Sequence, residues 1–161
     1  MALADSYYFL ELEPKVEGEA QTEGFEKMIH VTGFSTGLSL PVHWDTSNGD
    51  RTTGMPEVHG FTLSKRKDKA SPDLKAALWQ AKCYSKATIH LVRQDSKLQK
   101  NLEYMKFELD KVYITSIQGE DFETMSLSFN KMKWVYVPQQ KGMGAAGNVP
   151  FTYDLEKNKA E

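Results

Sequence analysis

The chain has 161 residues with 20 Lys and Arg against 22 Asp and Glu, a net charge of −2 that argues against a general nucleic-acid binder. The length suits one domain, and the single cysteine, Cys83, excludes a disulfide within the chain. No apolar run approaches the ~20 residues of a membrane span, and residues 1–9 lack a signal-peptide pattern. We therefore expect folding in the cytoplasm, no membrane anchor, and any export to occur without a cleaved leader.

The charges are unevenly distributed along the chain. Residues 1–60 carry three basic and ten acidic side chains, whereas residues 61–100 carry ten basic and three acidic ones. Residues 101–161 carry seven and nine, so the net charges of the three parts are −7, +7 and −2. Regions of opposite net charge either neutralise each other within the fold or contact each other between copies of the chain.

The first half of the chain is predicted to be β-rich. Ser6–Glu13 is an aromatic-rich strand, and Glu26–Val42 has strand character that is interrupted by Gly33 and Gly37, which indicates a bend or bulge. The polar stretch His43–Pro56 has almost nothing to bury and is predicted to be a long loop. Its length is near the range in which loops are functional or mobile.

A basic run follows a predicted strand at Val58–Lys65. It could be a nucleic-acid arm, an anion site at a helix N-terminus, or a solvated corner before a helix. Nucleic-acid modules usually add interleaved aromatic residues or a broad basic face, and neither is clear here. We therefore favour a corner whose charge contacts an acidic patch on another subunit, through Lys65, Arg66, Lys67 and Lys69.

One helix is predicted at about 71–82. Ser71 can cap its N-terminus, Pro72 suits the first helical position, and Asp73 favours the positive end of the helix dipole. Four apolar residues spaced i, i+3, i+4 and i+7 form one stripe, namely Leu74, Ala77, Leu78 and Ala81.

The remainder reads as strands, at Lys86–Arg93, Leu102–Asp110 and Val112–Ile117, followed by an alternating run from Met125. A phase slip at Asn130–Lys131 indicates a bulge. Seven to nine short strands with one helix predict a mainly β fold, a compact barrel-like pair of antiparallel sheets with one short α-helix, forming one domain over residues 1–161.

No motif indicates catalysis, a cofactor or a metal. Residues 142–147 match the dinucleotide pattern G-x-G-x-x-G, but no helical period follows them, so a loop is predicted. No stretch favours paired carboxylates for acid–base chemistry. The four histidines lack metal-ligand spacing; they are His30, His43, His59 and His90.

Four stretches, in this order, resemble one family. They are HGFTLSKRKDKASPDLKAAL at 59–78, YSKATIHLVRQ at 84–94, LEYMKFELDKVYITSIQ at 102–118 and TYDLEKNKAE at 152–161. The chain is identified by them as a member of the haemolysin-coregulated protein (Hcp) family, the tube subunit of bacterial type VI secretion. The most specific positions are Asp68, Lys69, Ser71, Pro72 and Leu74.

The resemblance implies a β-barrel-like fold, six copies in a ring, and rings stacked into a hollow tube. It implies a trimeric spike protein at the tip, a contractile sheath around the tube, and small effector proteins carried in the lumen by some members. The family is not catalytic in itself.

Three sets of residues are candidates for these contacts. The first third is expected to meet the basic run between copies, and Ser35 is a candidate for the channel wall because strand alternation turns it away from Phe34. Ring stacking is assigned to the predicted loop, through His43, Trp44, Asp45, Asp50 and Arg51.

The rival hypotheses are a monomeric soluble β-barrel that binds a small molecule and, less favoured, an enzyme.

Overall fold

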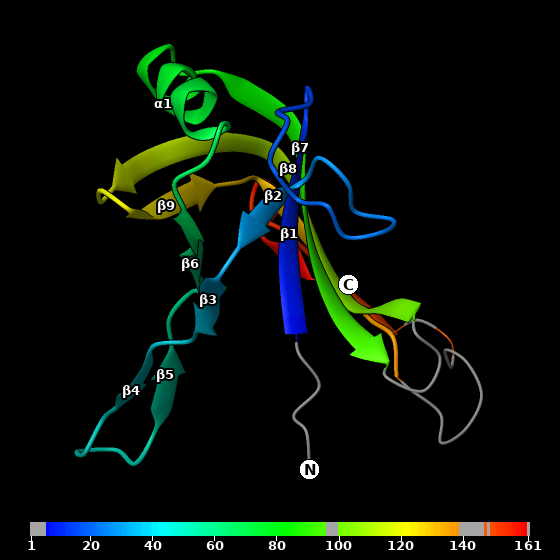
Figure 1. Ribbon diagram of the computed structural model, residues 1–161. Helices are drawn as coiled ribbons and strands as arrows, with labels where there is room; N and C mark the ends of the chain where they lie inside the picture. Colours follow the sequence, from blue (N-terminus) through cyan, green and yellow to red (C-terminus); the bar gives the residue numbers. More distant parts are fainter. Residues whose placement is uncertain (1–5, 96–99, 139–146, 148, 161) are drawn as a thin grey trace.

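The computed structural model describes residues 6–95, 100–138, 147 and 149–160, and it is dominated by strands (Figure 1). These residues contain one helix, α1, which spans Ser71–Trp79. The strands of the described residues are β1 Ser6–Glu13, β2 Ile29–Val31, β3 Gly33–Ser39, β4 Val42–Trp44, β5 Arg51–Thr53, β6 Glu57–Arg66, β7 Cys83–Asp95, β8 Lys100–Gln118, β9 Phe122–Ser128, β10 Lys131–Tyr136, β11 Val149–Asp154 and β12 Lys159–Ala160.

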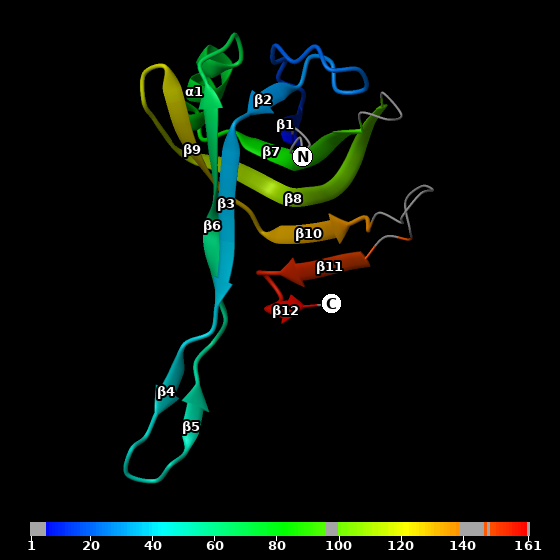
Figure 2. The ribbon, with the colours of Figure 1, turned by 60° about the horizontal axis from the view of Figure 1, so that its bottom comes forward.

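The 19-residue strand β8 organises the antiparallel pairing. It pairs with β7, while its first half also pairs with β10 and its second half with β9. From β7 the pairing continues to β1 and β2, from β9 to β6 and β3, and from β10 to β11 and β12. In the described part of the chain, ten strands thus form one curled, barrel-like sheet that does not close, and β4 with β5 forms a second sheet (Figure 2). The predicted mainly β fold with two antiparallel sheets and one short helix is confirmed.

Two predictions about strand breaks were wrong. The strands expected at Leu102–Asp110 and Val112–Ile117 are one continuous strand, β8, in which Lys111 adopts a positive φ of 51°. The phase slip at Asn130–Lys131 is not a bulge. It marks the point where the chain leaves β9 on one half of β8 and enters β10 on the other half.

The glycine-interrupted region behaves as predicted. Strand β2 ends at Val31, β3 begins at Gly33, and the register of β3 against β6 shifts between Ser35 and Gly37. The bend lets β2 pair with β1 while β3 pairs with β6, so one stretch of chain joins the two sides of the curled sheet.

The helix is shorter than predicted, because Ala81 has a φ of 51° and lies exposed beyond its end. Pro72 and Asp73 occupy the first turn as expected. Ser71 is not the cap: the N-cap residue is Ala70, without a side-chain cap hydrogen bond, and the Ser71 hydroxyl is buried below the helix. Of the predicted stripe, Leu74 and Ala77 are buried.

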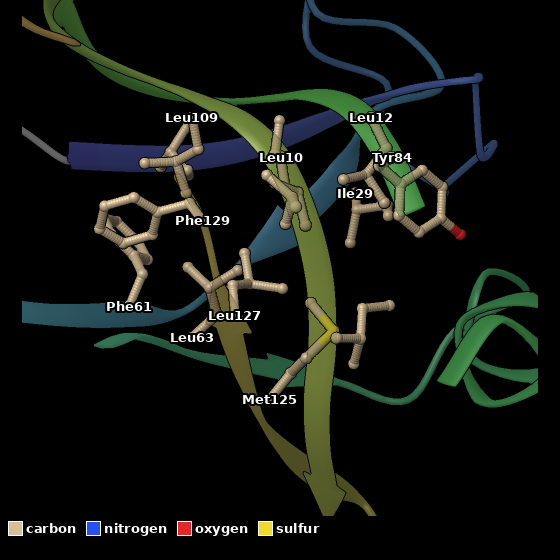
Figure 3. Packing of buried hydrophobic residues seen from close by; sticks show 14 of the residues in the cluster. Leu10, Leu12, Ile29, Phe61, Leu63, Tyr84, Leu109, Met125, Leu127 and Phe129 are labelled. Atoms are coloured by element: carbon tan, nitrogen blue, oxygen red, sulfur yellow. The ribbon is translucent and has the colours of Figure 1, made fainter. Parts of the chain in front are cut away.

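The core lies inside the curled sheet and combines alternating residues from most strands (Figure 3). Each fully buried Leu, Ile or Phe contributes about 1.5–3 kcal/mol relative to an exposed one, so these positions hold the strands together. The labelled core residues are Leu10, Leu12, Ile29, Phe61, Leu63, Tyr84, Leu109, Met125, Leu127 and Phe129.

No helix in the described part of the chain is long and apolar enough to cross a membrane.

Candidate functional site

Strands β4 and β5 form an arm that projects from the body (Figures 1 and 2). This region was predicted to be a loop, and that prediction was wrong, because Val42 to Trp44 pair antiparallel with Arg51 to Thr53. All six paired residues are exposed. Because neither face of the hairpin is buried, its strands lack the alternation of buried and exposed positions on which the sequence prediction relied. We call residues 42–53 the arm.

The tip of the arm is an ordered turn. The Asp45 carboxylate accepts hydrogen bonds from the backbone N–H of Ser47 at 2.9 Å and from its hydroxyl at 2.6 Å, and these bonds lower the pKa of Asp45. Gly49 has a φ of 69° and donates its N–H to the Asp45 carbonyl. The Arg51 guanidinium lies 4.0 Å from the centre of the Trp44 ring, which braces the two strands.

Of the five residues assigned to ring stacking, the structure places all on this arm, with Trp44, Asp45 and Arg51 shaping its tip. The arm and its base also expose large apolar side chains, including Trp44 at 57% and Met55 at 67%. Uncovered apolar surface of this kind is typical of interaction sites. The other members of this apolar surface are Leu38, Leu40 and Val42.

The basic run does not form one charged patch. Lys65 is only 1% exposed, so its assignment to a subunit contact was wrong. It lies in β6 in phase with Phe61 and Leu63, and the strand alternation turns it inward with them. Arg66 and Lys67 remain exposed, and the Arg66 guanidinium lies 5.1 Å from the centre of the Phe122 ring.

The buried Lys65 is the centre of an ionic network at the helix. Four oxygens lie within 3.1 Å of its ammonium group, from Asp68, Ser71, Glu123 and the Arg66 carbonyl. The Ser71 hydroxyl donates to Glu123 Oε2 at 2.8 Å. We call Lys65, Asp68, Ser71 and Glu123 the buried network; it ties α1 to β6 and β9.

Glu123 was missed by the sequence analysis. It is 1% exposed and lies in β9 in phase with the buried Met125 and Leu127, so the alternation could have identified it as an inward residue. Burial raises its pKa, but hydrogen bonds from Ser71 and Lys65 and the charges of Lys65 and Lys75 outweigh that effect. The pKa of Glu123 is consequently lowered from 4.5.

The acidic and basic parts of the chain meet within one copy. The Lys69 ammonium lies 3.7 Å from Glu17, and the Lys69 backbone N–H donates to Glu19. Lys69 is thus engaged by the loop that follows β1. Arg66 and Lys67 are the exposed members of the run that form no ion pair with another described residue.

Ser35 is exposed at a broad hollow of about 690 Å³ on the face of β3, β6, β9 and the second half of β8. Its neighbour Phe34 packs on Phe61 and Phe107 with ring centres 5.5 Å apart, so Ser35 faces away from the core as predicted. Small side chains line most of the hollow, and among the described residues that line it only His59 can carry a charge. Among the others are Gly60, Thr62, Thr115, Ser126 and Ser128.

The remaining sequence candidates do not converge on a chemical site. Residues 142–146 of the glycine-rich motif lie outside the described residues. His90 contacts Glu103 through Nδ1 and Glu11 through Nε2, while His30, His43 and His59 are exposed on separate strands. Within the described ranges no group of His, Cys, Asp or Glu is arranged to hold a metal ion.

Comparison with known proteins identifies the family. The sequence profile described as "Type VI secretion system effector, Hcp" matches residues 9–136, so the chain belongs to the Hcp family. No curated protein sequence matches it significantly.

Solved structures share the fold. A structure described as a type six secretion system protein has a TM-score of 0.86 and 23% identity, covering 98% of this chain and 100% of that one. Hcp1 from Salmonella typhimurium has a TM-score of 0.76 and 21% identity, covering 99% and 100%. Hcp3 from Pseudomonas aeruginosa has a TM-score of 0.64 and 20% identity, covering 93% and 99%.

We predict that Lys65→Met destabilises the protein by about 3–5 kcal/mol, because it leaves the buried Glu123 carboxylate without its main partner. The matched control is Lys67→Met, which removes an exposed charge two residues away and should change stability by about 0.5 kcal/mol or less. Urea unfolding of both variants measures the difference. Equal effects of the two substitutions would show that the buried network does not hold the helix.

A second prediction concerns acid. The folded-state pKa of Glu123 is lowered, so its charge stabilises the protein above about pH 4.5, and this contribution is lost as the pH falls through the folded-state value. Glu123→Gln should therefore cost about 1–3 kcal/mol at pH 7. The gap from the wild type should shrink toward pH 3 in urea unfolding, and a gap that stays constant with pH would contradict this role.

Proposed function

We propose that this chain is the self-assembling structural subunit of the type VI secretion tube. In this proposal the whole chain, residues 1–161, is one tube domain, six copies close into a ring, and rings stack into the inner tube. The observation that carries the proposal is an arm with uncovered apolar side chains on a body that belongs to the Hcp family. A structural role of this kind requires no catalytic residue, cofactor or metal.

A ring forms when one patch on each copy binds a different patch on the next copy, and when the rotation that relates neighbouring copies brings the last copy back to the first. Strand edges support this requirement: in the described part of the chain, β12 pairs only with β11 and β2 only with β1. Closing a ring would cover edges that otherwise invite uncontrolled pairing. Arg66 and Lys67 are the part of the basic run that we assign to a contact with acidic groups of a neighbouring copy.

Ring stacking is assigned to the arm. An exposed hairpin with apolar side chains gains stability when it packs against another ring. In this proposal, rings form in the cytoplasm, stack into a tube inside the sheath, and leave through the type VI apparatus with the trimeric spike. The proposed partners include neither nucleic acid nor a membrane anchor.

The central opening is assigned to the face that carries Ser35. A wall of small, nearly uncharged side chains would let a small effector protein pass without strong electrostatic trapping. Carriage or protection of such effectors is part of the proposed function.

The rival function, a monomeric barrel that binds a small molecule, predicts a different mass for the purified protein in solution, namely that of a single copy. Native mass spectrometry of the purified chain should show a species of six copies. A spectrum with only single copies across a wide concentration range would favour the rival and reject the tube subunit.

Arm variants test stacking separately from ring formation. Deletion of Thr46–Thr53 or the substitution Trp44→Ser should leave rings intact but shorten stacks in negative-stain micrographs, because the deletion removes β5 and the turn of the hairpin and the substitution removes apolar contact area. Trp79→Ser is the matched control, since Trp79 is 89% exposed on α1, away from the arm. Stacks of unchanged length in the arm variants would make the arm irrelevant to stacking.

Cysteine labelling tests the face that borders the opening. In a Cys83→Ser background, Ser35→Cys should react readily with a bulky thiol reagent in free subunits and at least about tenfold more slowly in end-capped tubes, because the wall is then enclosed. Cys83 is replaced because it is exposed. Equal labelling in both states would place Ser35 elsewhere.

A further inference from the structure

The outer face of the sheet carries a row of alternating charges that crosses six strands. Each residue lies directly opposite the next in the strand register, and neighbouring strands contribute opposite signs. Figure 2 shows β7, β8, β10, β11 and β12 stacked in this order. We call this set the charged row; from β1 to β12 it consists of Glu13, Lys86, Asp110, Lys131, Asp154 and Lys159.

The charged row lies on the face opposite the core. In every strand but β12, an adjacent residue on the other face is buried; these residues are Leu12, Ala87, Leu109, Met132 and Tyr153. Opposite charges that face each other across strands stabilise a sheet by about 0.2–1 kcal/mol per pair. Within the described residues, Lys86 forms its ion pair outside the row, with Glu108 at 3.5 Å. What matters for assembly is that the two ends of the row have different signs.

The acidic end is Glu13. It is exposed, and its carboxylate has no ion pair with any residue that the structure describes. Strand β2 pairs with β1 only at Tyr8 to Leu10, so no strand in the described ranges continues the row beyond Glu13.

The basic end is a small pocket of about 160 Å³ between β10, β11 and β12. Its lining residues are Lys131, Thr152, Asp154, Lys157 and Lys159. Asp154 Oδ1 already accepts hydrogen bonds from the backbone N–H groups of Glu156 at 2.9 Å and Lys157 at 3.2 Å. The described lining of this pocket contains three lysines and one carboxylate, which is held by backbone N–H groups, so its net charge is positive and attracts a further carboxylate.

We propose that Glu13 of one copy binds the lysine pocket of the next copy, so that the alternation of charges continues from subunit to subunit. This contact rests on the proposed function, because it requires that copies assemble side by side. A row with unlike ends joins head to tail, which is the kind of contact that a ring uses. Complementary charges at such a contact set its register and suppress wrong pairings.

Charge reversal tests the contact. Glu13→Lys and Lys159→Glu should each raise the concentration for half-maximal ring assembly about tenfold, because each places like charges together. The double variant should restore assembly to within about threefold of the wild type. Glu120→Lys is the matched control, since it makes the same charge change at an exposed turn residue between β8 and β9.

Sedimentation velocity of all five proteins at low and high salt provides the readout, and thermal unfolding confirms that each variant is folded. Weaker assembly in the single variants with recovery in the double variant supports the contact. Rings that assemble equally well in every variant, or a double variant without recovery, would overturn it while leaving the tube function intact. A wild-type chain that stays monomeric would overturn both.

Discussion

The arrangement of the chain around α1 depends on keeping the Lys65 charge satisfied away from water. A buried ammonium group is costly unless opposite charges and hydrogen bonds surround it, and here Glu123, Asp68 and Ser71 supply them. These partners come from β9, the corner after β6, and the first turn of the helix. The network therefore sets the position of the helix and the β6–β9 pair together.

The same strands carry the surfaces that we assign to assembly. Strands β3 and β6 pair with each other and expose the Ser35 face on one side. Figure 2 shows that they run outward from the body and continue into the arm. On the other side of the molecule, long β8 holds the series of strands that bears the charged row. A rigid core with separate outward surfaces is the arrangement that a building block needs.

The sequence predicts elements whose signals are local. The aromatic-rich run Ser6–Glu13 matches the observed β1, and Pro72 with Asp73 correctly marks the start of the helix. The arm was not predicted because its strands bury neither face. The role of Lys65 was misjudged because its partner Glu123 is 58 positions away, and the charged row depends on registers between distant strands.

The most direct test of the account is a cryo-electron microscopy reconstruction of the purified wild-type chain. The account predicts a hollow ring of six copies in which the Ser35 face borders the opening, the arms point along the ring axis, and β12 of each copy lies beside the β1 end of its neighbour. Single unassembled subunits, or a ring whose opening is bordered by the charged row, would contradict it.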